Sequence, residues 1–389
     1  MDIHIDYAGR VAKLCKAMES RGLDLFLGTR GKSVNYIAGA FVPWRSVLLA
    51  SRDGYLGLHT LLMDAERVKD DSWMENVVPC APLPGAELWE VTVRKIRELG
   101  LERATIGVEL GHSPRVIGGY LFATEYEYLK EQLPDARFVN ALDLMDELTF
   151  VKEPGEIKLM RQAAAIADAA QEQIRDSLYV GINELEIAGI GELEMRRRGS
   201  EFHWPVTGSS EIASGYRSWY ALGGCTPPTD KLVQRGESLL VDMHPTYKQY
   251  YSDLSHNYVL GKPSPEQRKL ADAYLTACEV LIASLKAGST IGDVFKKVSD
   301  ELSRSDYRRY TLPGFGHGLG VVGHEWHPPI IDSDEVRDLV LQEDVVEVAA
   351  MVINVPGVGG MRLECPVRVT ASGGEMLTTT PLELTVLDA

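Results

Sequence analysis

The sequence predicts an α/β protein of mixed α+β character, built from two domains. Strand and helix patterns alternate through residues 1–150, which is typical of a sheet covered by helices. At Val151–Gly155 (VKEPG) the alternation stops, and a proline in the first turn opens a long helix. Residues 151–389 then hold two helix pairs, each followed by strands, which suggests an internally duplicated unit around a central sheet. With 389 residues, the chain is long enough for a core in each domain.

The first domain, residues 1–150, is predicted to be a small α/β unit. Its expected helices are Asp6–Arg21, Glu90–Leu99 and Tyr120–Gln132, and its expected strands are Leu23–Leu27, Ser46–Ala50, Tyr55–Leu58 and Thr105–Glu109. The domain contains neither a glycine-rich phosphate loop nor a pair of neighbouring catalytic acids. We therefore expect it to shape the protein or to mediate oligomerisation rather than to catalyse.

The helices of the second domain, residues 151–389, are marked by their N-terminal residues. Asn183 with a glutamate three residues later, and Ser264 with Pro265 and a glutamine at the third helical position, are typical capping sequences. The expected helices run from Pro154 to about Leu178, from Asn183 to Arg198, from Ser264 to Gly288 and from Thr290 to about Ser303. From Thr311 onward, the pattern is strand punctuated by glycine.

The stretch Ser238–Asp253 carries the strongest chemical signal. Ser238–Met243 (SLLVDM) is expected to be an apolar strand carrying Asp242, and Tyr250–Leu260 a second strand carrying Asp253. If the two strands pair as an antiparallel hairpin, both carboxylates can lie on the same buried face. Two carboxylates in an apolar sheet repel each other and lose hydration, so they require a cation or a proton between them. The hairpin therefore predicts a pair of acids that bridge a metal ion.

Three later stretches can add ligands to this pair. They are PGFGHGLG around His317, GHEWHPP with His324 and His327, and GGMRLE, which ends at Glu364. The glycines beside His317 allow the backbone to approach a fixed centre closely. A set of two aspartates, a histidine and a glutamate mixes oxygen and nitrogen donors, which favours Mn²⁺, Fe²⁺, Co²⁺ or Zn²⁺.

The order and spacing of these motifs resemble the superfamily of aminopeptidase P, prolidase and methionine aminopeptidase, whose fold is called pita-bread. The two aspartates lie eleven residues apart, and the second of the two histidines follows the first by seven residues. The resemblance covers about residues 150–389, while residues 1–150 are similar to the N-terminal domain of prolidases and creatinase. It implies that one or two divalent cations per chain are bound by Asp242, Asp253, His317 and Glu364.

The resemblance also implies a reaction, which is metal-dependent hydrolysis of a small amide or peptide C–N bond. The default substrate is a dipeptide that ends in proline, and manganese is among the expected metals. His324 is expected to bind the substrate and to handle protons, with Glu364 as a further catalytic group. His244 or His327 can supply a catalytic or substrate-binding group. Arg362 either anchors a substrate carboxylate or neutralises Glu364, and the sequence leaves both roles open.

One expected metal ligand is missing from the chain. The family has a further glutamate about fourteen residues before the last ligand; aligned without gaps, it falls on Ala350, whose methyl group binds no metal. Glu347 is a poor substitute, because a shift of three residues reverses the side of the strand. A family histidine about eighteen residues before the first aspartate falls near Gly224, and the family glycine two residues after that aspartate is His244. Either the enzyme has diverged, as creatinase has, or Ala350 is an engineered inactivating change.

Two alternatives to an Xaa-Pro dipeptidase stay open at this point. The first is a non-peptidase relative, either a creatinase-like C–N hydrolase that needs little metal or a lyase that cleaves dimethylsulfoniopropionate on this fold. The second is a catalytically inactive pita-bread module that binds a peptide or a protein partner. Four retained ligand positions favour an enzyme, because a binding module has no need of buried acids without a counter-charge.

Composition limits the partners and the compartment. A net charge of −16, without a large basic patch, argues against nucleic acid and anionic membranes as partners. The five cysteines are scattered without CxxC spacing, which indicates reduced thiols. The sequence shows neither a basic and apolar leader nor a run of about 18 apolar residues. We therefore expect a cytoplasmic homodimer that acts on a small molecule or a dipeptide.

Overall fold

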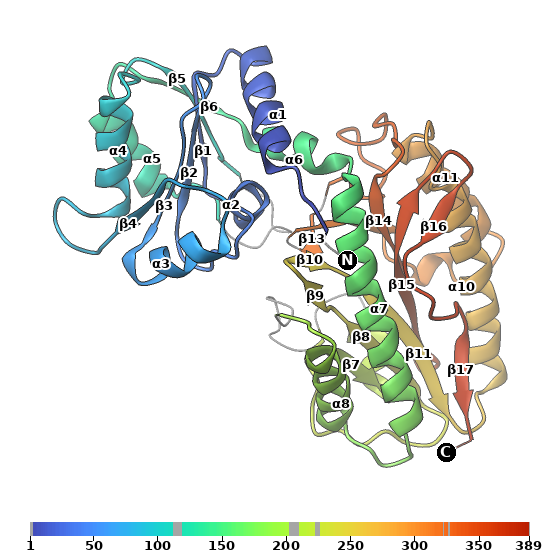
Figure 1. The fold of residues 1–389 in the computed structure, drawn as a ribbon. Helices are drawn as coiled ribbons and strands as arrows, with labels where there is room; N and C mark the ends of the chain where they lie inside the picture. Colours follow the sequence, from blue (N-terminus) through green and yellow to red (C-terminus); the bar gives the residue numbers. More distant parts are fainter. Residues whose placement is uncertain are drawn as a thin grey trace. The chain divides into compact units, whose positions relative to one another are not determined.

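The structure, a computed structural model, describes residues 3–111, 119–201, 210–221, 226–321, 323–325 and 327–388. Within these ranges, the side chains of residues 220, 221, 323 and 324 are not described. The chain divides into two units, His4–Thr149 and a second unit that begins at Phe150. Each unit has its own sheet, as the ribbon in Figure 1 shows.

The first unit is a six-stranded sheet with the strand order β4-β3-β2-β1-β5-β6. The pairs β1/β5, β5/β6 and β3/β4 are parallel, while β2 pairs antiparallel with both β1 and β3. In chain order the elements are α1 (Tyr7–Ser20), β1 (Leu25–Gly28), α2 (Gly31–Ala38), β2 (Val47–Ser51), β3 (Leu56–Leu61), α3 (Leu62–Asp71), β4 (Val77–Cys80), α4 (Leu88–Glu98), β5 (Thr105–Val108), α5 (Ala123–Gln132), β6 (Arg137–Asn140) and α6 (Leu142–Phe150).

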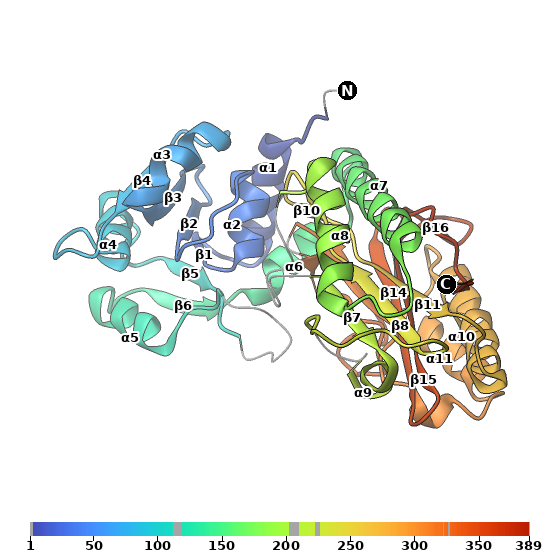
Figure 2. The same cartoon turned by 90° about the horizontal axis from the view of Figure 1, so that it is seen from below.

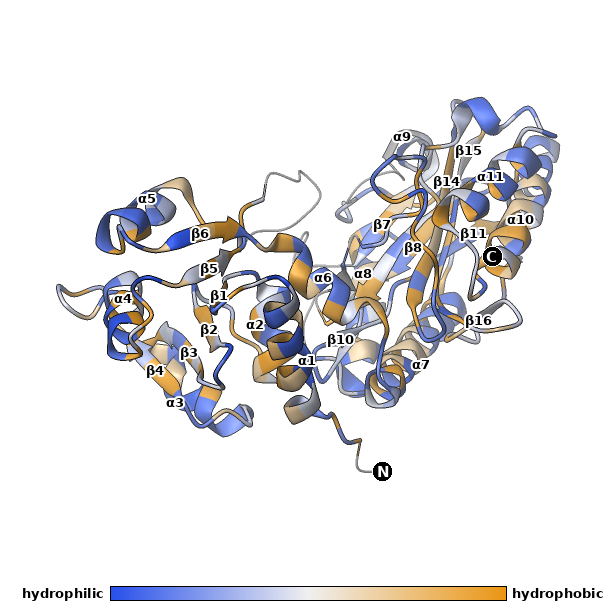
Figure 3. Ribbon diagram, turned by 90° about the horizontal axis from the view of Figure 1, so that it is seen from above, coloured by the Kyte–Doolittle hydropathy of each residue, from blue (hydrophilic) through white to orange (hydrophobic). Residues whose placement is uncertain are grey.

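Helices cover this sheet because their apolar residues are spaced to face it. Val93 and Ile96 of α4 and Leu129 of α5 pack against alternate strand residues such as Leu27 and Ile106. Figure 3 shows α4 carrying both hydrophilic and hydrophobic colours, as expected for a helix with one side on a core. The expected helices and strands of this unit are present, with ends shifted by a few residues. The sequence analysis did not anticipate α2, α3, α6, β4 and β6.

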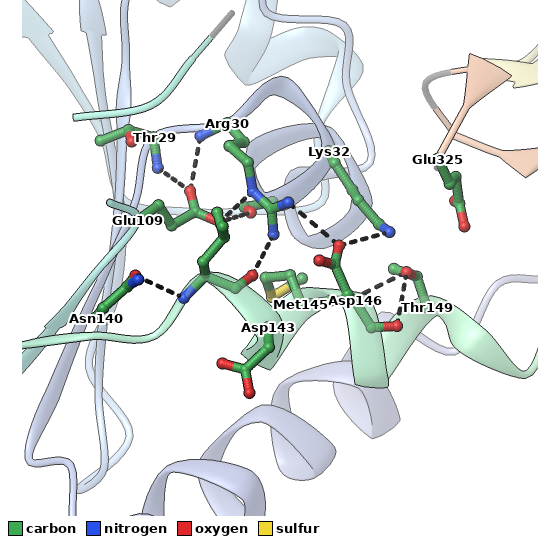
Figure 4. Close-up of polar contacts among 12 residues, drawn as sticks. Thr29, Arg30, Lys32, Glu109, Asn140, Asp143, Met145, Asp146, Thr149 and Glu325 are labelled. Atoms are coloured by element: carbon green, nitrogen blue, oxygen red, sulfur yellow. Dashed lines mark hydrogen bonds and ion pairs between the residues drawn. The ribbon is translucent and has the colours of Figure 1, made fainter. Parts of the chain in front are cut away.

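A buried polar network ties the start of α2 to β5 and α6 (Figure 4). The Glu109 carboxylate accepts the backbone N–H groups of Thr29 and Arg30, the Nε–H of Arg30 and the hydroxyl of Ser33. The guanidinium of Arg30 and the ammonium of Lys32 both reach the Asp146 carboxylate, at 3.2 and 3.0 Å. Because Glu109 has this many donors, we interpret the network as structural support for the unit.

The second unit is built on a nine-stranded sheet. The order along its main path is β13-β12-β14-β15-β11-β8-β7, with β16 paired to β15 and β17 paired to β11. In chain order the elements are α7 (Pro154–Ser177), α8 (Glu184–Arg197), β7 (Glu211–Ser214), η1 (Gly215–Arg217), α9 (Ser218–Ala221), β8 (Ser238–Met243), β9 (Thr246–Tyr247), β10 (Tyr250–Tyr251), β11 (Leu254–Leu260), α10 (Pro265–Ser284), α11 (Ile291–Leu302), η2 (Arg308–Tyr310), β12 (Gly316–Gly320), β13 (Gly323–His324), β14 (Val346–Val355), β15 (Gly359–Val369), β16 (Gly374–Met376) and β17 (Leu384–Leu387).

Two helix pairs cover one face of this sheet. The pair α7 and α8 packs on β8 and β11, and the pair α10 and α11 packs on β14 and β15; Figure 2 shows each pair side by side. The strand residues beneath them alternate, as Leu239 and Val241 do on β8 and Leu363 and Cys365 do on β15. The strand pairing places these residues on the same face, so the opposite face of the sheet is left for polar residues.

The helix starts in this unit follow the capping sequences. Ser264 accepts the N–H of Gln267, whose side chain accepts the N–H of Ser264, and a proline holds the first turn of α10. Asn183 and Thr290 accept the corresponding N–H groups at the starts of α8 and α11. No helix in the described ranges is both long enough and apolar enough to cross a bilayer.

One predicted strand is wrong in its first residues. The expected strand Tyr250–Leu260 is interrupted at Ser252 and Asp253, between β10 and β11, and a tight turn at Lys248 and Gln249, with φ angles of 46° and 70°, precedes β10. This tight turn pairs Tyr250–Tyr251 with Thr246–Tyr247 as a separate two-stranded ribbon. The ladder with β8 begins only at Leu254, so Asp253 lies just before β11 rather than within it.

A buried tyrosine fixes the two long strands β14 and β15 to helix α10. The Tyr274 hydroxyl donates to the Met351 carbonyl at 2.6 Å, lies 3.0 Å from the Leu363 carbonyl and accepts the Leu363 N–H at 2.8 Å. The side chain is fully buried. Loss of this hydroxyl would leave buried strand groups without a partner, which is costly in a dry interior.

We expect Tyr274→Phe to lower the free energy of unfolding by about 1–3 kcal/mol, the cost of buried polar groups left unsatisfied. The measurement is urea unfolding followed by circular dichroism. Tyr307→Phe is the matched control, because Tyr307 is also buried but its hydroxyl makes no hydrogen bond among the described residues. Equal stability of the two variants would contradict this account of Tyr274.

Candidate metal centre

A row of paired residues crosses the uncovered face of the second sheet. Glu211 of β7 pairs with Asp242 of β8, and Asp242 pairs with Ser255 of β11. Ser255 pairs in turn with Glu364 of β15, which pairs with Ala350 of β14. Directly paired residues project to the same side of a sheet. Five strands therefore contribute one side chain each to a single line, on the face opposite the helices.

Two carboxylates of this line, Asp242 and Glu364, form a group with Asp253, which lies just before β11. Asp242, Asp253 and Glu364 are exposed by only 0, 1 and 4%, and each offers an oxygen within 4.8 Å of the others. His317 of β12 is also buried, and its Nε2 lies 3.7 Å from Oδ2 of Asp253. The structure therefore brings together all four residues expected as metal ligands.

Arg362 lies inside this ring of acids. Its Nη2 donates to Oδ2 of Asp242 at 2.6 Å and to Oε2 of Glu364 at 2.7 Å, and its Nη1 lies 3.4 Å from Oε2 of Glu211. Burial alone would lower the pKa of Arg362, but Glu364, Asp242 and Glu211 outweigh that effect and raise it. The sequence left two roles open for Arg362, anchoring a substrate carboxylate and neutralising Glu364. Its contact with Glu364 fits the second role.

His244 lies between the two aspartates. Its Nε2 is 3.5 Å from Oδ2 of Asp242 and 3.4 Å from Oδ1 of Asp253. Burial opposes the charge on its imidazole, yet Asp242, Asp253 and Glu211 raise the pKa of His244 to about 10. Burial also raises the pKa of Asp242, against the lowering effects of His244 and Arg362. Without a metal ion, an imidazolium would hold this space.

The donor set fits a divalent cation. Oδ1 of Asp242 is buried and has no hydrogen-bond partner among the described residues, although Oδ2 is bound by Arg362. Ser255 donates to Oε2 of Glu364 at 2.6 Å, which fixes the orientation of that carboxylate. A buried carboxylate oxygen without a donor is costly, and a cation is the usual remedy where several acids converge.

Comparison with known proteins agrees with this geometry. Residues 158–371 match the model of the metallopeptidase family M24, and residues 10–151 match the creatinase/prolidase N-terminal domain. The chain belongs to metallopeptidase family M24. Its sheet with two helix pairs on one face is the pita-bread fold of that family, preceded by a creatinase/prolidase-type N-terminal domain.

Relatives resemble the chain over its whole length. An Xaa-Pro dipeptidase of Pyrococcus horikoshii is 27% identical over 375 residues, which are 96% of this chain and 98% of the relative. An Xaa-Pro dipeptidase structure from Bacillus anthracis is 27% identical with a TM-score of 0.83 and covers 98% of this chain and 100% of its own. An X-Pro aminopeptidase structure from Thermotoga maritima is 26% identical, also with a TM-score of 0.83, and covers 97% and 99%.

Ala350, where the resemblance led us to expect a glutamate, faces the centre. Ala350 pairs directly with Glu364, so its methyl group projects to the side that carries the acids. Glu347 is three residues earlier and projects to the opposite side, where Lys152 and Glu325 form a buried ion pair of 3.0 Å. Glu347 therefore does not take the place of a ligand at position 350.

The two remaining histidines are described unequally. The backbone of His324 lies in β13, where it pairs with Leu319, while its side chain lies outside the described residues, as does Gly224. His327 is half-buried, and its ring meets the edge of Phe150 with 5.8 Å between centroids.

Glu211 is the site residue that the sequence analysis missed. It begins the four-residue strand β7 (EIAS), and nothing in that short run indicates a functional residue. Its place beside Asp242 depends on the pairing of β7 with β8. Its burial cannot be read from the sequence, so no local signal could have found it.

The buried acid Glu347 predicts a pH dependence of stability. Burial raises the pKa of Glu347 well above its ordinary value, with Lys152 opposing and Glu325 adding to the shift, and neither carboxylate oxygen has a hydrogen-bond partner among the described residues. The unfolded chain releases this proton near its ordinary pKa, whereas the folded chain keeps it. Stability from this group is therefore present at low pH and is lost as the pH rises.

We expect Glu347→Gln, which cannot ionise, to gain stability over the parent chain as the pH rises from 4.5 to 7.5. Each unit of pKa difference is worth about 1.4 kcal/mol. The measurement is the melting temperature at several pH values. Glu343→Gln is the control, because Glu343 is exposed on the segment just before β14. A gap between Glu347→Gln and the parent that does not change with pH would refute the assignment.

Proposed function

We propose that this chain is a metal-dependent hydrolase of the Xaa-Pro dipeptidase type, with a dipeptide ending in proline as its substrate. The observation that carries the proposal is the convergence of Asp242, Asp253 and Glu364, with His317 beside Asp253, on the uncovered face of the sheet. Relatives named Xaa-Pro dipeptidase that match the chain end to end support the same reaction class.

The cation would be held by Asp242, Asp253, His317 and Glu364. When bound, it supplies Lewis-acid chemistry, polarising the scissile carbonyl and making water more acidic. Mn²⁺, Co²⁺, Fe²⁺ and Zn²⁺ all suit this mixture of carboxylate and imidazole donors. We propose one or two such ions per chain.

The side chains around the cation orient groups and move protons. Ser255 holds Oε2 of Glu364 through its hydroxyl, so that the carboxylate keeps one orientation while it exchanges protons with the reacting groups. Arg362 holds Asp242 and Glu364 in register by donating to both. His244 places Nε2 beside both Asp242 and Asp253, and His324, by family resemblance, would bind the substrate carbonyl.

Ala350 should make this centre weaker than that of a full family member. A glutamate at position 350 would project toward Glu364, and its absence removes one carboxylate from that side of the cation. The same absence, together with the guanidinium of Arg362 among the acids, favours one second candidate. That candidate is a creatinase-like C–N hydrolase that acts on a non-peptide amide and depends less on metal.

We further propose a homodimer that works in the cytoplasm with a small substrate. The cysteines Cys15, Cys80, Cys278 and Cys365 are free thiols, as expected in a reducing compartment. The net charge of −16 suits a small-molecule substrate better than a nucleic acid.

We expect Ala350→Glu to raise the rate of Xaa-Pro dipeptide cleavage by about 10²–10⁴-fold, the usual effect of one electrostatic or acid–base group. The assay is dipeptide hydrolysis with Mn²⁺, Co²⁺, Fe²⁺ or Zn²⁺ supplied. Ala350→Gln has the same size without the charge and serves as the control. An unchanged peptidase rate, with loss of another amide hydrolysis, would favour the creatinase-like candidate.

We expect Asp253→Asn to abolish hydrolysis and to reduce the bound metal, because Asp253 touches both the acid group and His317. Elemental analysis of protein purified without chelator gives the metal content. Asp272→Asn, at an exposed position on α10, is the matched control and should keep both properties. Full activity and full metal content in Asp253→Asn would rule out the proposed centre.

A further inference from the structure

We propose that Glu211, Asp242 and His244 form a second cation position, so that two divalent cations in this chain share Asp242. The proposal rests on the metal centre proposed above, but not on any particular substrate. It adds a ligand from β7, a strand from which the sequence analysis expected no metal ligand.

The three residues meet because of backbone pairing. Glu211 is the direct partner of Asp242, and such partners have Cβ atoms about 4.5–5.5 Å apart. His244 follows Asp242 by two residues, so in extended backbone its side chain returns to the same face. Each of the three offers a ligand atom within 4.8 Å of the other two, and all three are buried. Two carboxylates and an imidazole are suitable ligands for Zn²⁺, Co²⁺ or Mn²⁺.

A second observation points to a cation at this position. Asp242 is fully buried, its Oδ2 is bound by Arg362, and its Oδ1 has no hydrogen-bond partner in the described part of the chain. One oxygen of this carboxylate is bound and the other is unsatisfied, and both groups of ligands share it. It is therefore well suited to bridge two metal ions. In this arrangement Asp242 belongs both to the group with Glu211 and to the group with Asp253.

The charges around the row leave room for more than one cation. Four buried carboxylates, those of Glu211, Asp242, Asp253 and Glu364, converge with the guanidinium of Arg362 and the imidazole of His244. His244 must be neutral to bind a metal ion, and one divalent ion would then leave a net negative charge in a buried place, which is unfavourable. The contact of Arg362 with Glu211, at 3.4 Å, is longer than its contacts with Asp242 and Glu364, so Glu211 can turn toward a metal ion without losing a strong ion pair.

The ligand set of this chain is thus displaced across the sheet. At the β14 end of the row, position 350 offers only a methyl group. At the β7 end, Glu211 and His244 add one carboxylate and one imidazole. The second cation position therefore lies at the β7 end of the row, away from Ala350.

The test counts cations and measures their affinity, independently of catalysis. Metal-free full-length protein is titrated with Co²⁺ or Mn²⁺ by calorimetry, and bound metal is measured after equilibrium dialysis. The parent chain should bind two ions. Glu211→Gln and His244→Ala should each weaken one of the two sites by more than about 10-fold, since even outer partners of ligands contribute 10–100-fold to metal affinity. Asp253→Asn should weaken the other site.

Glu347→Gln is the matched control, because Glu347 is an equally buried acid on the opposite face of the same sheet. It should bind both ions as the parent does. If Glu211→Gln or His244→Ala fails to fold, anomalous diffraction from parent crystals grown with Co²⁺ gives the answer directly. A peak among Glu211, Asp242 and His244 supports the proposal.

Two outcomes would overturn the inference. One is a parent-like count and affinity in both Glu211→Gln and His244→Ala, and the other is a Co²⁺ peak only among Asp242, Asp253 and Glu364. Failure of the proposed function looks different, because a chain that binds two ions as described but cleaves no dipeptide would lose the dipeptidase proposal and keep the cation position.

Discussion

The register of β15 is the constraint on which the rest of the centre depends. Glu364 must stand opposite Ser255 on one side and Ala350 on the other, because a slip of one residue would turn its carboxylate into the core beneath α10 and α11. The apolar residues Leu363 and Cys365 hold that register by filling the core. Tyr274 reinforces it through three contacts with the backbones of β14 and β15. The packing of one face thus decides the chemistry of the other.

Charge compensation is the second requirement of this face. Buried acids are tolerated only where positive charge is available, and here it comes from Arg362 and His244 as well as from any bound cation. Both side chains reach Asp242, which makes that aspartate the electrostatic centre of the row. On the opposite face, burial raises the pKa of Glu347, and Lys152 pairs with Glu325.

Local sequence patterns predicted the local features, such as helix caps. They failed for features that depend on the pairing of strands distant in the sequence. The cap at Ser264 depends on residues within one helical turn, so its pattern could be read directly. The role of Glu211 could not be read, because it arises from pairing with a strand that begins 27 residues later. The tight turn at Lys248 and Gln249 was not predicted because neither residue type demands a positive φ. The order of four motifs, those of Asp242, Asp253, His317 and Glu364, was enough to predict the family. The alanine at position 350 did not prevent this, because the order of the other motifs is kept.

The residues of this row are also synthesised at different times, which matters for folding of the newly made chain. Its first members, Glu211 and Asp242, leave the ribosome more than 100 residues before Glu364 and Arg362 do. Until β15 arrives, the early acids lack their guanidinium partner and the strand that aligns them. Any cation held by this centre would therefore meet the full set of acids only after β15 has been made. A chain cut short before residue 362 would carry Glu211, Asp242 and Asp253 without the guanidinium of Arg362.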